Sequence, residues 1–272
     1  MMVEEYLAQV DQAYESCPGG EEAEKRLIVL TEQCGDEHGR DSAAYASLLG
    51  ELGGFYRGQG RYEQAEACFH RALPLLETWL GVGSPQYATT LNNLAGVHRL
   101  MGRCGQAMEE FHRCLELYRA SVGECHILYA SGLNNLSLVH LDLGDLEMAL
   151  ELQRQAADIL DRLPQAKGEL VSSLCNQGAL CQRLGRLEEA EEKLKRALVL
   201  LREELSTHTP HYHAVLNALG VVHYAAGRFA AALDCFSQAA QAAQTLYGPD
   251  HPEVKAALTH RALAEERLEA RS

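Results

Sequence analysis

Several histidines of the sequence recur at a regular spacing, and a group of histidines can bind a metal ion or carry protons. His98, His140 and His223 each stand four residues before a glycine, an offset that Tyr56 and Cys181 occupy elsewhere. The glycines recur about every 42 residues, so these side chains fall on successive repeats, which pack roughly 8–10 Å apart. Metal ligands must converge to about 2.0–2.3 Å from one ion. We therefore predict that these histidines pack between helices and form no metal site.

A second set of histidines, His208, His211 and His213, lies within one short segment. It lacks the HExxH or Cys-plus-His patterns that make zinc sites specific, so we predict a polar loop, with zinc binding as the weaker alternative. The sequence has no phosphate-binding loop, dinucleotide fingerprint, serine elbow or kinase motif. We expect no catalytic residue, no metal and no cofactor, and we predict that the protein is not an enzyme.

The glycines belong to a repeat that runs through most of the chain. They follow one another at spacings of 42, 42, 41 and 42 residues: Gly60, Gly102, Gly144, Gly185 and Gly227. An alanine stands five residues after each of them: Ala65, Ala107, Ala149, Ala190 and Ala232. A leucine stands eleven residues before each: Leu49, Leu91, Leu133, Leu174 and Leu216. We call each set of residues at a fixed offset from these glycines a column. Columns that persist from one glycine to the next indicate one repeated structural unit.

Each repeat is predicted to be a pair of helices. Apolar residues at spacings of three and four, as in Leu91, Leu94 and Val97, indicate the first helix. The column glycine ends that helix and permits a tight turn. The second helix carries a small residue and an aromatic, as in Ala65 and Phe69, which lets helices approach closely. Strand-like alternation is absent.

The pattern predicts one solenoid domain over residues 1–272. A degenerate first repeat, with Leu7, Tyr14 and Ala23 on their columns, is followed by full repeats and a final capping helix. The approximate bounds are 1–42, 43–84, 85–126, 127–167, 168–209, 210–251 and 252–272. Terminal repeats are expected to be atypical, because an end repeat faces water on one side.

Composition narrows the choice of partner and compartment. The formal net charge of −14 argues against nucleic acid, whose phosphates need clustered lysine and arginine. No stretch approaches the ~18 apolar residues of a membrane span, and the opening residues lack a signal-peptide pattern. The 9 cysteines form no CxxC pair, so we expect reduced thiols in a reducing compartment. We predict a cytoplasmic protein without a membrane or nucleic-acid partner.

Several segments resemble a known family: TTLNNLAGVH (89–98), GLNNLSLVH (132–140) and LYGPDHPEV (246–254). They are similar to tetratricopeptide repeats, and the 42-residue period is similar to the kinesin-light-chain-like subtype. The resemblance covers almost the whole chain. It implies an all-α fold: a right-handed α-solenoid of antiparallel helix pairs with a C-terminal capping helix.

The resemblance also implies a peptide-binding groove along the first helices. Its positions lie 10, 9 and 3 residues before the glycines, and here they hold Asn92, Asn134 and Asn217, then Asn93, Asn135 and Asn176, then Arg57, Arg99, Gln182 and Tyr224. Asparagine amides can pair with the main chain of an extended peptide, and the arginines suit an acidic segment. Alternatively, each asparagine fixes repeat geometry. Lysine is absent from the first of these columns, which disfavours a clamp for the C-terminal carboxylate of heat-shock proteins.

We therefore predict a scaffold or adaptor that binds an extended segment of a protein or peptide partner in its concave groove. One alternative is a peptide-sensing regulator whose solenoid changes curvature on binding. Another is a self-assembling repeat protein that forms a homo-oligomer.

Overall fold

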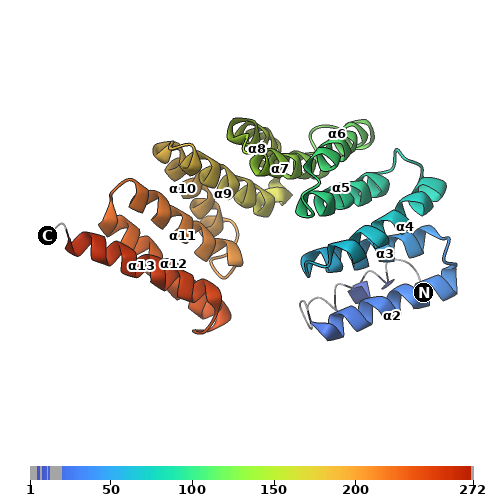
Figure 1. Cartoon of the computed structure of the whole chain (residues 1–272), viewed down its shortest axis with the longest axis horizontal. Coiled ribbons are helices and arrows are strands. Elements are labelled where there is room, and N and C mark those ends of the chain that lie inside the picture. Colours follow the sequence, from blue (N-terminus) through green and yellow to red (C-terminus); the bar gives the residue numbers. More distant parts are fainter. Residues whose placement is uncertain (1–4, 7, 11, 13–19, 271–272) are drawn as a thin grey trace. The chain divides into compact units, whose positions relative to one another are not determined.

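The computed structural model describes residues 5–6, 8–10, 12 and 20–270 (Figure 1). Over this part of the chain the elements are helical and no strand occurs. In chain order they are α2 (Glu21–His38), α3 (Ala43–Gly58), α4 (Tyr62–Leu80), α5 (Pro85–Leu100), α6 (Cys104–Ser121), α7 (Ile127–Asp142), α8 (Leu146–Asp161), the 3-10 turn η1 (Pro164–Ala166), α9 (Lys167–Arg183), α10 (Leu187–Glu203), α11 (Pro210–Ala225), α12 (Phe229–Tyr247) and α13 (Pro252–Glu269). The predicted all-α fold of helix pairs is confirmed.

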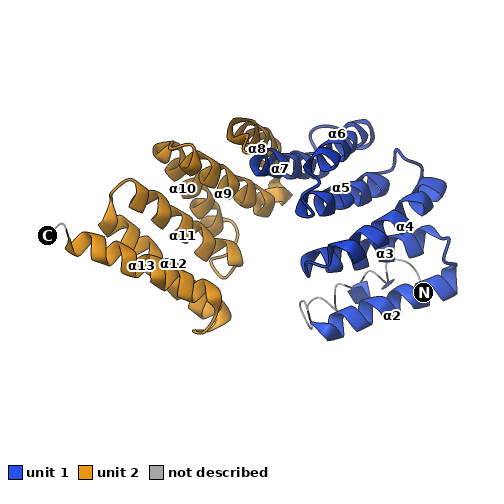
Figure 2. Cartoon of the chain, in the orientation of Figure 1, with its two compact units in different colours: residues 1–143 blue, residues 144–272 orange. Residues whose placement is uncertain are grey.

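The chain divides into two compact units, Met1–Leu143 and Gly144–Ser272 (Figure 2). We call them unit 1 and unit 2. In unit 1, α2, α3, α4, α5, α6 and α7 each pack on the next helix in the chain, and in unit 2 the same holds from α8 to α13. A single domain over residues 1–272 stays a prediction. Of the predicted first repeat, Ala23 is buried in α2, whereas Leu7 and Tyr14 lie outside the described residues.

The turns inside the repeats use the backbone freedom of the column glycines. Gly102 has φ 79° and Gly144 has φ 81°, a conformation that residues with a Cβ adopt at a cost. At the end of α5 the Gly102 N–H donates to the Arg99 oxygen at 2.9 Å, and the Arg103 N–H donates to the His98 oxygen at 2.8 Å. These bonds satisfy helix-terminal carbonyls, so the glycine both ends α5 and directs the chain into α6.

Close packing inside a repeat depends on the small residue seven positions before the glycine. At Gly53 an added Cβ would lie 2.8 Å from the Phe69 ring, and at Gly220 it would lie 2.4 Å from the Phe236 ring. Both phenylalanines are buried. The missing Cβ therefore makes room for an aromatic ring between the two helices of the pair.

A buried polar cluster explains why Gln177 stands eight residues before its glycine, where the other repeats have Leu52, Leu94, Leu136 and Leu219. Its Nε2 donates to the main-chain oxygen of Gln153 at 3.0 Å, and the Ser173 hydroxyl donates to the Gln153 Oε1 at 3.0 Å. All three side chains are buried between α8 and α9. Polar groups can replace apolar packing here because they find partners across the helix interface.

A second repeated feature is an ion pair between neighbouring repeats. An arginine directly after the column glycine contacts a glutamate of the preceding repeat at 2.6 Å in four places: Arg61–Glu24, Arg103–Glu66, Arg186–Glu147 and Arg228–Glu191. These arginines are well exposed, so each pair contributes about 0–1 kcal/mol. At the remaining position Asp145 instead caps α8, accepting from the Met148 N–H at 3.2 Å.

Across the described residues, no helix combines the length and apolar character needed to span a membrane. The predicted cap 252–272 contains α13, and its last two residues lie outside the described part.

Candidate functional site

The first helices of neighbouring repeats in unit 1 border an open hollow of about 620 Å³. We call it the unit 1 hollow. Most of its lining comes from α3 and α5, including Ser47, Gly54, Arg57, Gln86, Thr89 and Asn93. Arg57 and Asn93 were predicted as groove residues, and the structure brings them together here. Gln86 and Thr89 were missed, although they precede Asn93 by seven and four residues, a spacing that places all three on one face of α5.

Two charged side chains line the unit 1 hollow, the exposed Glu51 and the half-buried Arg57. The Arg57 Nη1 donates to the Asn93 Oδ1 at 3.3 Å and lies above Gly96, where an added Cβ would stand 3.3 Å from it. Burial, followed by repulsion from Arg99, lowers the pKa of the Arg57 guanidinium. No carboxylate of the described residues forms an ion pair with it. The hollow thus contains a half-buried positive charge that forms no ion pair with a described residue of its own unit.

The two asparagine columns differ in their surroundings. Asn92 is 5% exposed, and its Oδ1 accepts a bond from the Asn135 Nδ2 at 3.3 Å. This bond links α5 to α7, so these two amides contribute to packing between repeats. Asn93, by contrast, is half-buried and lines the unit 1 hollow. The Oδ1 of Asn134 is buried and has no hydrogen-bond partner among the described residues.

Arg99, the remaining predicted groove residue of unit 1, forms an ion pair. The Arg99 Nη1 is 2.7 Å from the Asp142 Oδ2, so its charge is balanced within the unit. Of the two arginines predicted to select an acidic ligand, Arg57 is therefore the one with unbalanced charge.

Unit 2 holds the remaining predicted groove residues without gathering them around one hollow. Asn176 and Gln182 are half-buried on α9. Asn217 contacts the His260 Nδ1 through its Oδ1 at 2.9 Å. The Tyr224 hydroxyl accepts from the Arg267 Nε at 3.3 Å, and its ring packs edge-on against Phe229. Asn217 and Tyr224 thus contact side chains of their own unit.

The clustered histidines do not converge, and the predicted polar loop is wrong for two of them, because α11 begins at Pro210 and contains His211 and His213. His208 and His211 are exposed, whereas His213 is buried with its ring edge-on to Tyr247. Among the described residues, the metal-capable group of side chains includes none of these three. The positions of these three histidines therefore give no support to zinc binding, the weaker of the two predicted alternatives.

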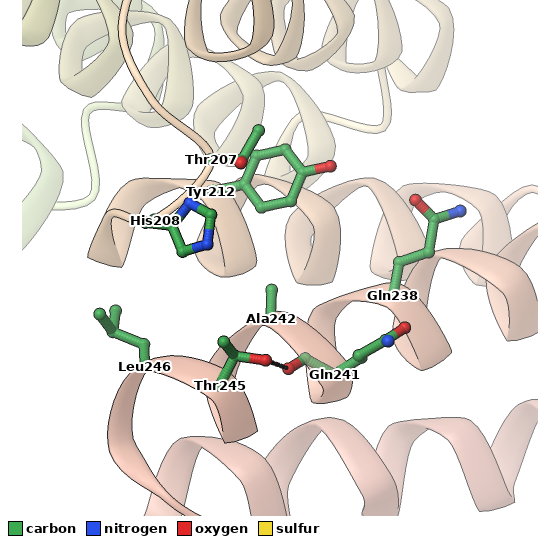
Figure 3. A pocket seen from close by; sticks show the side chains of 8 residues that line it. All are labelled: Thr207, His208, Tyr212, Gln238, Gln241, Ala242, Thr245 and Leu246. Carbon is green, nitrogen blue, oxygen red and sulfur yellow. Dashed lines mark hydrogen bonds between the residues drawn. The ribbon is translucent and has the colours of Figure 1, made fainter.

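His208 instead borders a hollow of about 270 Å³ between the loop, α11 and α12 (Figure 3). The Tyr212 hydroxyl at its edge accepts from the Arg202 Nη2 at 3.2 Å. The Thr245 hydroxyl donates to the Gln241 main-chain oxygen at 2.9 Å (Figure 3). These polar groups already have partners inside unit 2, so they give no sign of a missing ligand.

The histidine column is buried as predicted at two positions, whereas His140 is half-buried. His98 is fully buried and His223 is 9% exposed. Burial lowers the pKa of His223, helped by the charge of Arg228. The His98 ring contacts two carboxylates, Glu110 through Nδ1 at 2.6 Å and Glu66 through Nε2 at 3.2 Å.

Comparison with known proteins identifies the family to which the chain belongs. The tetratricopeptide repeat model matches residues 41–120, 128–203, 169–242 and 211–271. The chain therefore belongs to the tetratricopeptide repeat family. Proteins built from these repeats generally mediate protein–protein interactions and are typically non-enzymatic. No curated protein sequence matches the chain significantly.

Solved structures match the fold of the chain. The crystal structure of BtubC (BKLC) from P. vanneervenii has a TM-score of 0.66 and 21% identity, covering 93% of this chain and 94% of that one. The nearly identical TPR-like repeats of a kinesin light chain-type protein from Podosopora anserina have a TM-score of 0.59 and 18% identity, covering 73% and 95%. A single-substitution variant of the same repeats has a TM-score of 0.60, with 18% identity and coverage of 72% and 93%. The predicted kinesin-light-chain-like repeat type is confirmed.

Proposed function

We propose that the chain is a cytoplasmic, non-catalytic scaffold or adaptor that holds an extended segment of a partner protein in the unit 1 hollow. The observation that carries the proposal is the unbalanced guanidinium of Arg57 in a hollow lined by hydrogen-bonding side chains. The partner segment is expected to place an acidic side chain beside Arg57. The predicted alternatives, a regulator that changes curvature and a self-assembling protein, lack an observation of this kind.

The charge argument rests on what a ligand carboxylate would change. Arg57 is half-buried, and its charged form is disfavoured by burial and by the nearby charge of Arg99. A carboxylate on the ligand would form a charge-assisted bond, which is roughly twice as strong as a neutral one. Its present partner, the Asn93 Oδ1, offers a neutral acceptor at 3.3 Å. An acidic ligand therefore gains a contact that the free protein does not satisfy.

The lining of the unit 1 hollow suits main-chain recognition as well. Asn93 and Gln86 offer amide donors and acceptors, and Ser47 and Thr89 offer hydroxyls that rotate to donate or accept. Such groups can pair with the peptide N–H and C=O groups of an extended segment whatever its side chains. Specificity would then come from the acidic position opposite Arg57.

The proposal can be tested by selecting peptides from a random library on the parent protein. Selected peptides are expected to share an aspartate or glutamate and to lose affinity for Arg57→Gln. The matched control is Arg202→Gln, which removes an exposed arginine from α10 in unit 2. Selected peptides without acidic residues, or equal binding to both variants, would contradict the proposal. Light scattering over a concentration series separates self-assembly, which requires a mass that rises with concentration.

A further inference from the structure

One histidine outside the predicted column lies next to His98. His70 and Glu66 are one turn apart on α4, and His98 approaches them from α5. The Glu66 Oε1 is 3.2 Å from the His98 Nε2 and 3.8 Å from the His70 Nε2. One ligand-type atom from each of the three residues lies within 4.8 Å of the others. We propose that Glu66, His70 and His98 bind a divalent transition-metal ion of the zinc class.

The spacing of the three groups matches the requirement of such an ion. Zinc bonds to imidazole nitrogen and carboxylate oxygen at about 2.0–2.2 Å in a tetrahedral arrangement. Two ligands on a tetrahedron of that size stand roughly 3.3–3.6 Å apart. The Glu66–His98 distance of 3.2 Å lies just below this range, and the Glu66–His70 distance of 3.8 Å lies just above it. The His70 side chain is 56% exposed and can close the remaining gap by rotating.

His98 is held in the orientation that a metal ligand needs. Its Nδ1 contacts the Glu110 Oε2 at 2.6 Å, which leaves the Nε2 facing Glu66. Glu110 is itself fixed by the Gln106 Nε2, which donates to its other oxygen at 3.1 Å. A carboxylate on one imidazole nitrogen selects the tautomer and increases the basicity of the other nitrogen toward a metal. Glu110 is thus a positioning residue rather than a ligand.

Arg103 competes with the metal for Glu66. Its Nη1 contacts the Glu66 Oε1 at 2.6 Å, as its counterparts do in the ion pairs between repeats. Burial alone would raise the pKa of Glu66, but the bonds from Arg103 and His98 outweigh it and lower that pKa. An ionised carboxylate has about four lone-pair sites, so Glu66 can bind both cations, but the positive charge of Arg103 then lies close to the metal ion and repels it. Removing Arg103 should therefore strengthen metal binding.

Unit 2 contains the same framework without the second histidine. Glu191 pairs with Arg228 at 2.6 Å, as Glu66 does with Arg103, and His223 occupies the column of His98. One turn after Glu191 stands Lys195, whose Nζ contacts the Glu191 Oε1 at 2.6 Å. A lysine offers no acceptor for a cation at neutral pH. His70 is therefore the residue that turns an ordinary ion pair between repeats into a three-ligand set.

This comparison supplies the test variant. His70→Lys copies the arrangement of Glu191 and Lys195, so the fold should be kept while one ligand is lost. His112→Lys, at an exposed position on α6, makes the same substitution outside the cluster. Zn²⁺ is titrated calorimetrically into the parent and both variants, which share the same cysteines, so any zinc bound by thiols is a common background.

The proposal expects one additional Zn²⁺ per chain in the parent and in His112→Lys, absent in His70→Lys. Glu110→Gln should weaken binding roughly 10- to 100-fold, as loss of an outer-shell partner does. Arg103→Gln should bind more tightly than the parent. Equal zinc binding in the parent and His70→Lys, or none in the parent, would overturn it. If His70→Lys is misfolded by circular dichroism, His70→Gln serves in its place and the same outcomes apply.

Discussion

Neighbouring glycines on α3 provide a matched test of the packing. At Gly53 an added Cβ would stand 2.8 Å from the buried Phe69 ring, whereas at Gly54 it would meet nothing within 4 Å. Neither glycine has a positive φ, and both lie inside the helix. Gly→Ala therefore gives the same gain in helix propensity at both positions, and the two variants differ in the contact that the new methyl group makes.

The magnitudes give opposite signs for the two variants. Replacing a helix-interior glycine by alanine gains about 0.5–1 kcal/mol, so Gly54→Ala should raise the free energy of unfolding by that amount. Overpacking a core costs about 1–3 kcal/mol. Gly53→Ala should therefore lie about 1–3 kcal/mol below Gly54→Ala, because the propensity term cancels in the comparison.

The single tryptophan supplies a local assay. Trp79 at the end of α4 donates its Nε1–H to the Asp41 main-chain oxygen at 2.5 Å, so its fluorescence follows the pairing of α3 with α4. With an m-value of about 2 kcal/mol/M, the two urea midpoints should differ by about 0.5–1.5 M. Equal midpoints would show that Phe69 does not pack against Gly53 as described.

Three further perturbations have signs that follow from the structure. Gly144→Val places a β-branched residue at φ 81° and should lower stability by about 1–3 kcal/mol, more than Asn93→Ala, as measured by thermal melting. Burial lowers the pKa of His213 and His223 below 6.5, so the unfolded chain binds more protons than the folded one as pH falls through that value. The stability contributed by these groups is therefore expected to be complete above about pH 6.5 and to decline as the pH falls below it, and less so in His223→Asn, by urea titration at each pH. Gln153→Met keeps volume but removes the side-chain acceptor of Ser173, whose hydroxyl keeps the Gln153 main-chain oxygen at 3.1 Å, so the cost in the same titration should be only about 0.5–1.5 kcal/mol.

Much of the fold could be predicted because the repeat places the same physical requirement at the same offset many times. Gly102 and Gly144 end their helices with positive φ, as their column predicted. The helix pairs follow from apolar spacings that are local in the sequence. Local signals failed at Gln177, because its partner Gln153 lies on another helix, 24 residues away.

The candidate site was harder to predict for the same reason. Asn92 and Asn93 are consecutive and of the same type, but one is buried against Asn135 and the other lines the unit 1 hollow. Their roles depend on how neighbouring repeats are rotated, which no single column reveals. Similarly, His98 was compared with histidines of its own column, whereas the structure brings it to His70 from a different column of the preceding repeat.

The unit 1 hollow can be blocked without disturbing the packing around it. Gly54 lines the hollow, and a Cβ added at this position would meet nothing within 4 Å. Gly54→Leu should therefore fill part of the binding surface, while Gly54→Ala serves as the control with an unobstructed hollow. Both variants should be at least as stable as the parent, so a loss of binding would not be a consequence of unfolding.

The most direct test is the affinity of a library-selected acidic peptide for Gly54→Leu and Gly54→Ala, measured by fluorescence anisotropy at fixed ionic strength. We predict that Gly54→Ala binds like the parent and that Gly54→Leu binds at least about tenfold more weakly, a loss of ~1.4 kcal/mol or more. Equal affinity for the two variants would contradict the account and place the partner on another surface of the protein.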